Sequence, residues 1–246
     1  KTNNFGLNLG FVNNRIQLEF DYYIKHTNNL LMPNPLPWYM GTNGTGSVES
    51  PYINVGDIQT KGWGATLITT NIANKNFKWE TNFNISAFKS TIERFYSEAA
   101  LINRTSWWLG DWTQRSVVGQ APWLFRGYIE EGLFTSIEEI EKSPVPVDNN
   151  GNRLPIDQTN GLWVGDVKFK DISGPDGTPD GKIDVYDETF IGNPWPKLFA
   201  GFTNTFSYKN FDLSILLTGT YGNDIYNYLA RVNSNPNNTN VSQNLL

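Results

Sequence analysis

Twelve residues of the chain, 176–187, have the spacing of a calcium-binding loop. They place oxygen ligands at positions 1, 3, 5, 9 and 12, with glycine at position 6 and an apolar residue at position 8. The predicted ligands are Asp176, Thr178, Asp180, the carbonyl of Lys182, Asp184 and Asp187. Many oxygens on a flexible backbone favour Ca²⁺ over Mg²⁺. The threonine at position 3 and the aspartate at position 12 depart from the pattern, which leaves an alternative in which these aspartates cap backbone amides without metal.

A second group of candidate binding residues consists of tryptophans. The sequence gathers Trp107, Trp108, Trp112 and Trp123 within one stretch of the chain. Indole rings form platforms for sugar rings and pockets for apolar peptide groups, so we predict that these residues bind substrate. The alternative is that the four rings pack this stretch together.

Catalytic chemistry has little support in the sequence. His26 is the only histidine and there is no cysteine, so a Ser-His-Asp triad or a histidine-rich zinc site would depend on one residue. We therefore expect no enzymatic activity and no organic cofactor. The net charge of -5 and the absence of a basic stripe argue against a nucleic-acid partner.

The elements that would position these residues are β-strands. In residues 15–25 the even positions from Ile16 to Ile24 are apolar, and the odd positions are charged or polar except for Tyr23. Only a strand with two different surroundings uses a period of two over eleven residues. Strands of soluble proteins usually have about 5 to 6 residues, whereas a strand that crosses a bilayer obliquely needs about 9 to 11. The length predicts the wall of a membrane barrel, with its apolar face toward lipid.

Six such strands are predicted, at residues 5–11, 15–25, 59–71, 77–95, 198–208 and 211–221. They form three hairpins with short turns at Asn13, Lys75 and Lys209. Two long links remain: a loop from Leu31 to about Gly56, and residues 97–196, in which a helix is predicted to begin at Ser136. Short turns and long loops are typical of outer-membrane barrels, whose long loops face outside. Six strands cannot close a barrel, for which about 8 are needed, so we expect the chain to be a piece of a longer protein.

Five segments strongly resemble the SusC/RagA family of TonB-dependent outer-membrane transporters of Bacteroidetes. They are FGLNLGFVNNRIQLEFDYYIKHTNNLLM, INVGDIQTKGWGATL, FRGYIEEGLFTSIEEI, GDVKFKDISGPDGTPDGKIDVYDETFIGNPWPKLFAGF and FSYKNFDLSILLTGTYGNDIYN. The resemblance implies a 22-strand barrel, a SusD-like lipoprotein partner, and uptake of glycans or peptides. It also implies coupling to TonB, ExbB and ExbD through a plug region that this chain does not contain.

A second hypothesis is a soluble β-sandwich module for carbohydrate binding or adhesion, with a calcium loop. The two hypotheses differ in the apolar strand faces. A transporter exposes Phe20, Leu213 and Ile215 to lipid, whereas a soluble sandwich buries them.

Overall fold

The computed structural model describes residues 1–33, 52–96, 103–105 and 112–233. Two compact units are present. The first unit comprises residues 1–25, 60–89 and 194–246, and the second comprises residues 26–59 and 90–193. None of the helices in the described part of the chain is long and apolar enough to cross a membrane.

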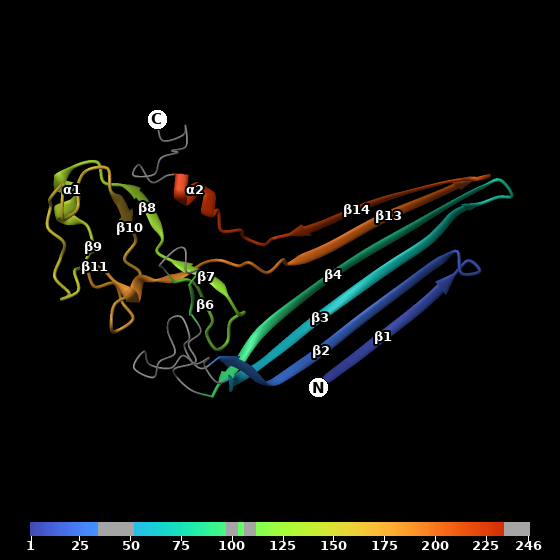
Figure 1. Cartoon of the computed structure of the whole chain (residues 1–246), viewed down its shortest axis with the longest axis horizontal. Coiled ribbons are helices and arrows are strands. Elements are labelled where there is room, and N and C mark those ends of the chain that lie inside the picture. Colours follow the sequence, from blue (N-terminus) through green and yellow to red (C-terminus); the bar gives the residue numbers. More distant parts are fainter. Residues whose placement is uncertain (34–51, 97–102, 106–111, 234–246) are drawn as a thin grey trace, which may run out of the picture. The chain divides into compact units, whose positions relative to one another are not determined.

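The long strands form one six-stranded sheet with the order β1-β2-β3-β4-β13-β14 (Figure 1). Their bounds are β1 (Thr2–Phe11), β2 (Ile16–Pro33), β3 (Tyr52–Ala73), β4 (Phe77–Phe95), β13 (Leu198–Tyr208) and β14 (Phe211–Tyr221). The pairs β1–β2, β4–β13 and β13–β14 are antiparallel. β4 and β13 are neighbours although residues 96–197 separate them in the sequence.

The three predicted hairpin turns are present, and all lie at the same end of the sheet (Figure 1). Val12, Asn13 and Asn14 all have positive φ, between 53° and 62°, which is the left-handed conformation that tight hairpins require. Lys209, with φ of 52°, donates its backbone N–H to the carbonyl of Asn76 at 3.0 Å. This bond ties the turn of the third hairpin to the turn of the second.

The strand register places the apolar residues on one face of the sheet. Leu7 lies opposite Phe20, and Phe202 lies opposite both Phe83 and Leu217. Residues directly opposite one another share a face, and Phe20 also stacks on Trp63 of β3 at 6.5 Å between ring centroids. We call this the apolar face. It carries the odd positions of β1, β4 and β14 and the even positions of β2 and β13.

The apolar face is not buried. Phe20, Leu213 and Ile215 are 41%, 57% and 47% exposed, respectively. A soluble sandwich would bury these three side chains, so their exposure favours the barrel segment. The prediction of an antiparallel barrel segment is confirmed.

Three strands are longer than predicted. β1 begins at Thr2 instead of residue 5. β2 continues to Pro33, and β3 begins at Tyr52, in a region where a loop to about Gly56 was expected. Backbone pairing does not require alternating side chains, so the polar run after Lys25 continues the strand although the period of two ends there. Asn29 has φ of 57°, which interrupts the regular alternation.

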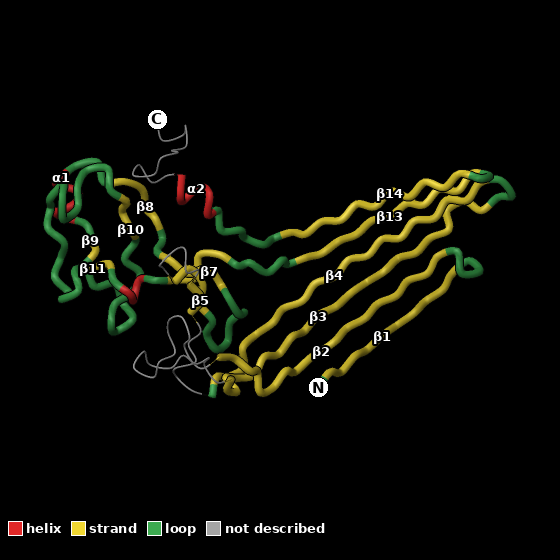
Figure 2. The backbone as a smooth tube through the Cα atoms, in the orientation of Figure 1, coloured by secondary structure: helices red, strands yellow, loops and turns green. Residues whose placement is uncertain are grey.

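In the described part of residues 97–193, the second unit contains short strands, turns, the α-helix α1 and a short 3₁₀-helix, η3 (Figure 2). Its strands form the small sheets β12-β7-β6-β5, β10-β8 and β11-β9. The bounds are β5 (Asn103–Thr105), β6 (Trp112–Arg115), β7 (Leu124–Gly127), β8 (Glu130–Leu133), α1 (Ile137–Lys142), β9 (Val145–Pro146), β10 (Val167–Phe169), β11 (Lys182–Ile183), η3 (Val185–Asp187) and β12 (Thr189–Gly192). The remaining helix, α2 (Tyr228–Asn233), belongs to the first unit.

The second unit has its own hydrophobic core. Phe134, Ile140, Val145 and Leu162 are at most 7% exposed and pack together. The predicted helix start is present, because Ser136 Oγ accepts the backbone N–H of Glu139 at 3.2 Å. The carboxylate of Glu139 accepts from Thr135 instead of Ser136, so only half of the predicted capping box forms.

Candidate functional site

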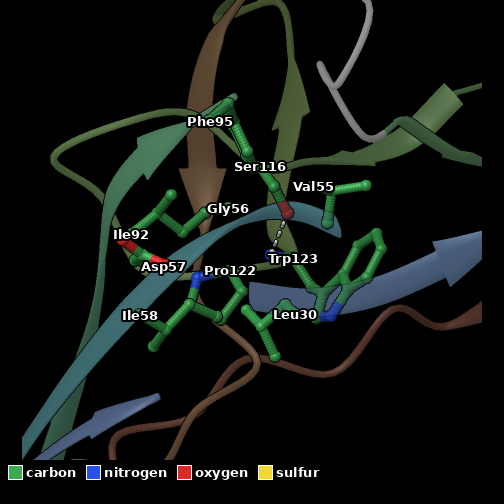
Figure 3. A pocket seen from close by; sticks show the side chains of 10 residues that line it. All are labelled: Leu30, Val55, Gly56, Asp57, Ile58, Ile92, Phe95, Ser116, Pro122 and Trp123. Atoms are coloured by element: carbon green, nitrogen blue, oxygen red, sulfur yellow. Dashed lines mark hydrogen bonds between the residues drawn. The ribbon is translucent and has the colours of Figure 1, made fainter. Parts of the chain in front are cut away.

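A cavity of about 150 Å³ lies within the second unit (Figure 3). It is bordered by the ends of β2, β3 and β4 and by the segment that precedes β7. Eight of its ten lining residues are apolar or glycine, which makes it a pocket for an apolar group. The lining residues are Leu30, Val55, Gly56, Asp57, Ile58, Ile92, Phe95, Ser116, Pro122 and Trp123.

Trp123 holds an unusual backbone conformation in this pocket. Its φ of 63° lies in the left-handed region, which costs an L-residue about 1 to 2 kcal/mol. Its backbone N–H donates to Ser116 Oγ at 3.0 Å, and Ser116 is only 1% exposed (Figure 3). A strained residue held by a dedicated buried partner is most often found at a binding site.

The other polar lining residue, Asp57, is 4% exposed, and both of its carboxylate oxygens accept hydrogen bonds. Its Oδ1 accepts from the hydroxyl of Tyr96 at 2.6 Å and from the backbone N–H of Asn29 at 3.0 Å. Its Oδ2 accepts from Arg94 Nε at 2.6 Å. The hydrogen bond from Tyr96 contributes most to lowering the pKa of Asp57, followed by the bonds from Asn29 and Arg94. Asp57 therefore stays ionised at neutral pH and joins the ends of three strands.

The single histidine belongs to a neighbouring polar bridge. His26 Nδ1 lies 3.3 Å from Glu93 Oε2, and His26 Nε2 lies 3.4 Å from Gln59 Nε2. Gln59 in turn donates to Glu93 Oε1 at 2.8 Å. These contacts link β2, β3 and β4, so the histidine has a structural role in this arrangement.

The four tryptophans that were predicted to bind substrate do not all lie in the described part of the chain. Trp107 and Trp108 lie outside the described residues. The backbone of Trp112 pairs with Thr105 in the sheet of β5 and β6. Trp123 lines the pocket, and substrate binding by the group stays a prediction.

The acidic loop uses its carboxylates as backbone caps. Asp176 Oδ1 accepts from the backbone N–H of Thr178 at 3.0 Å and from its hydroxyl at 2.8 Å. Asp180 Oδ1 accepts from the N–H of Lys182 at 3.0 Å. Asp184 Oδ1 accepts from the N–H two residues further on, at 2.8 Å. Each of these bonds closes a local turn, as the alternative without metal requires.

Asp187 is the most deeply buried member of this loop, with 0% exposure. Its Oδ1 accepts from the N–H groups of Ile172 and Ser173 at 2.8 and 3.2 Å, and its Oδ2 accepts from Asp184 N–H at 2.9 Å. Both oxygens of the predicted position-12 ligand are thus occupied by backbone amides. Within the described ranges, no three acidic or histidine side chains gather in a metal-binding arrangement.

Asp171, five residues before the predicted loop, was not among the predicted ligands. Its Oδ2 accepts from Gly181 N–H at 2.6 Å, whereas its Oδ1 is buried and has no hydrogen-bond partner among the described residues. A cation held by this loop would satisfy that oxygen. Calcium binding at residues 176–187 stays a prediction, with Asp171 as an additional ligand to test.

The first unit also contains an aromatic cluster that was not predicted from the sequence. Phe88 stacks on Phe199 with ring centroids 5.7 Å apart, and Trp195 meets Phe88 edge to face at 5.9 Å. The alternation of β4 and β13 places Phe88 and Phe199 opposite to the apolar face. The only sequence signal for them is an aromatic at a position where the pattern expects a polar residue.

Comparison with known proteins gives a consistent family. TonB-dependent receptor P26 from Formosa agariphila is 34% identical over 92% of this chain and 20% of its own length. TonB-dependent receptor P3 of the same organism is 31% identical over 91% of this chain and 20% of its own length. The chain is related to the TonB-dependent receptors. TonB-dependent receptor SusC from Bacteroides thetaiotaomicron is 24% identical over 91% of this chain and 19% of its own length, and the resemblance to the SusC/RagA family is confirmed.

Solved structures support the fold of a TonB-dependent receptor. The RagAB peptide importer in its closed-closed state matches 90% of this chain and 21% of its own chain, with a TM-score of 0.58 and 22% identity. Its open-open state gives a TM-score of 0.59 at 21% identity over 90% of this chain and 20% of that chain. No family model matches the chain. The chain spans about one fifth of the length of the curated relatives that it matches.

Proposed function

We propose that the chain forms part of the wall and outer loops of an outer-membrane importer that depends on TonB and takes up a glycan or peptide nutrient. The apolar face carries this proposal. Its apolar side chains recur at every second position of the long strands, and several of them, including Phe20, Leu213 and Ile215, are exposed, as a surface that meets lipid requires. The family of the chain supports transport, because its relatives are TonB-dependent receptors.

In this proposal the short turns face the periplasm and the long connections between the hairpins face outside. The turn at Lys209 and its neighbours lie at one end of the sheet, whereas the connections at the other end span 18 residues or more. Loops of this length are normally functional, and the second unit has a core of its own that gives it a defined shape. The pocket beside Trp123 then belongs to an outer vestibule that meets the nutrient.

Two partners follow from the family and are part of the proposal. A SusD-like lipoprotein would cover the vestibule and hold a large ligand. TonB, with ExbB and ExbD, would supply energy through a region outside this chain. No catalytic step is assigned, since the cluster around His26 bridges three strands and the relatives are receptors.

The proposal is tested by uptake into cells that express the full-length protein. Fluorescent peptides and fluorescent oligosaccharides are supplied to cells with TonB, to cells without TonB, and to cells in which this gene is deleted. We expect uptake of one pool that requires both TonB and the gene. Uptake that persists without TonB would refute the energy coupling, and uptake unchanged by the gene deletion would refute the import function.

The lipoprotein partner is tested separately. An affinity tag on the full-length protein is used to purify it from membranes in mild detergent, and co-purifying proteins are identified by mass spectrometry. We expect a lipoprotein at about one copy per importer. Its absence would remove the partner from the proposal and leave the uptake result intact.

A further inference from the structure

We propose that the pocket beside Trp123 binds one apolar side chain of a peptide, so that the nutrient is a peptide and not a glycan. This inference rests on the proposed import function and names its class of substrate. Three properties of the pocket carry it: its size, the state of its polar groups and its preformed shape.

The size of the pocket matches a single side chain. An apolar cavity of about 150 Å³ is large enough to hold a benzene ring and stays dry when empty. The cavity beside Trp123 has this volume, and its walls include Leu30, Ile58 and Ile92. A phenylalanine, leucine, isoleucine or methionine side chain would fill it. One sugar ring is of similar size, so the apolar lining, and not the volume, separates the two classes of ligand.

The pocket offers few polar groups to sugar hydroxyls. Asp57 accepts three hydrogen bonds, from Asn29, Tyr96 and Arg94, and these use both of its carboxylate oxygens. Ser116 is engaged with the N–H of Trp123. Most of the lining is apolar, so a sugar ring with several hydroxyls would leave more hydrogen bonds in water than this pocket replaces, which disfavours glycans. An apolar side chain has no such cost.

The pocket is held open by contacts among its own walls. The N–H of Ile92 donates to the carbonyl of Gln120 at 3.0 Å, and the N–H of Gly119 donates to the carbonyl of Ile92 at 2.9 Å. These two bonds fix the segment before Trp123 against β4. Preformed apolar pockets bind with a small ordering cost, and the strained backbone of Trp123 is consistent with a position selected for binding.

The test fills the pocket from one side. Leu30→Trp places a large ring into the cavity, and Leu31→Trp is the matched control because Leu31 is the next residue of β2 and is 63% exposed. Full-length importer in detergent is incubated with a random hexapeptide pool and, separately, with a pool of mixed oligosaccharides. Retained molecules are identified by mass spectrometry. The affinity of a retained phenylalanine-containing peptide and of its alanine analogue is then measured.

We expect the wild-type protein and Leu31→Trp to retain peptides enriched in one large apolar residue. Replacing that residue by alanine should weaken binding about tenfold to a hundredfold, and Leu30→Trp should cause a similar loss for the phenylalanine peptide. Leu30→Ala enlarges the cavity and should shift the preference toward tryptophan. This variant keeps the inference falsifiable if Leu30→Trp fails to fold.

The inference is overturned if the wild-type protein retains oligosaccharides, retains neither pool, or binds the alanine and phenylalanine peptides within twofold of each other. It is also overturned if Leu30→Trp folds and keeps the wild-type preference. These outcomes are independent of the uptake experiment. If the protein retains apolar peptides but uptake does not require TonB, the proposal of TonB-dependent import is refuted and the assignment of the pocket is not.

Discussion

The hydroxyl of Tyr96 donates a hydrogen bond of 2.6 Å to Asp57 Oδ1 and so ties the end of β4 to the end of β3. Arg94 and Asn29 complete the set of donors around this buried carboxylate. The network therefore fixes the three strand ends that form one wall of the pocket. Its electrostatics give a first prediction.

Stability of this region should depend on pH through Asp57. Its pKa in the folded protein lies below the usual value of 3.8, chiefly because Tyr96 donates to the charged form. The folded state therefore gains stability above about pH 4, and this gain is lost as the pH falls through the lowered pKa. Asp57→Asn should be less stable than the wild-type protein at pH 6, with a difference that shrinks toward pH 2. Thermal unfolding followed by tryptophan fluorescence measures it, and a difference that grows on acidification would contradict the account.

The sequence could not predict this network. Asp57 and Tyr96 are 39 residues apart, and nothing in their local spacing indicates that they meet. The pairing exists because β3 and β4 are neighbours that extend beyond the part with alternating side chains. The alternation of apolar and polar residues predicted the sheet. Where the two faces of a strand have similar surroundings the alternation ends, so it could not predict the extended part of β3.

A second prediction concerns the core of the second unit. Ile140 is 0% exposed, so Ile140→Ala should destabilise this unit by about 2 to 5 kcal/mol through lost burial and the cavity left behind. The matched control is Ile137→Ala, because Ile137 is on the same helix and is 38% exposed. Limited proteolysis of the full-length protein should cut the second unit of Ile140→Ala first. Equal protease resistance of the two variants would show that this core does not hold the unit together.

This core also explains why residues 97–196 could be predicted only in part. The helix start at Ser136 was found because a capping residue followed by glutamates is a local signal. The strands around it have two to four residues, which is too short for a period of two to be recognised. The core forms between residues as distant as Phe134 and Leu162, which only the three-dimensional structure brings together.

The third prediction is that the acidic loop binds Ca²⁺ in the range of about 10⁻⁴ to 10⁻³ M typical of extracellular sites. Asp180 and Asp184 each accept a backbone N–H through one carboxylate oxygen. The buried Oδ1 of Asp171 has no hydrogen-bond partner among the described residues. Calorimetry of the full-length protein should show binding heat that Asp180→Ala and Asp171→Asn reduce. Heat that neither variant changes, or no heat at millimolar Ca²⁺, would favour the alternative in which the aspartates only cap amides.

Residues 176–187 show which features a sequence pattern can predict and which it cannot. Both interpretations of residues 176–187, with and without metal, predict a turn-rich acidic segment, because aspartate and glycine have strong local preferences. The spacing did not predict that Asp187 turns inward to bind the amides of Ile172 and Ser173, which precede the loop. The inward orientation of the Asp187 side chain depends on how the segment packs.

The orientation of the apolar face is the central claim, and a labelling scan of β14 tests it most directly. These 246 residues contain no cysteine. Single cysteines introduced at positions 212–217 therefore each carry one spin label in a full-length protein from which any cysteine outside this chain has been replaced by serine. Oxygen collects in lipid, and a water-soluble nickel complex reports the aqueous lumen. The full-length protein in liposomes should show maximal oxygen access at Leu213, Ile215 and Leu217. Minimal oxygen access is expected at Asp212, Ser214 and also Leu216, which is apolar but pairs with Thr203 on the other face. Equal access along the strand, or maxima at the even positions, would contradict the assignment of this sheet to a membrane wall.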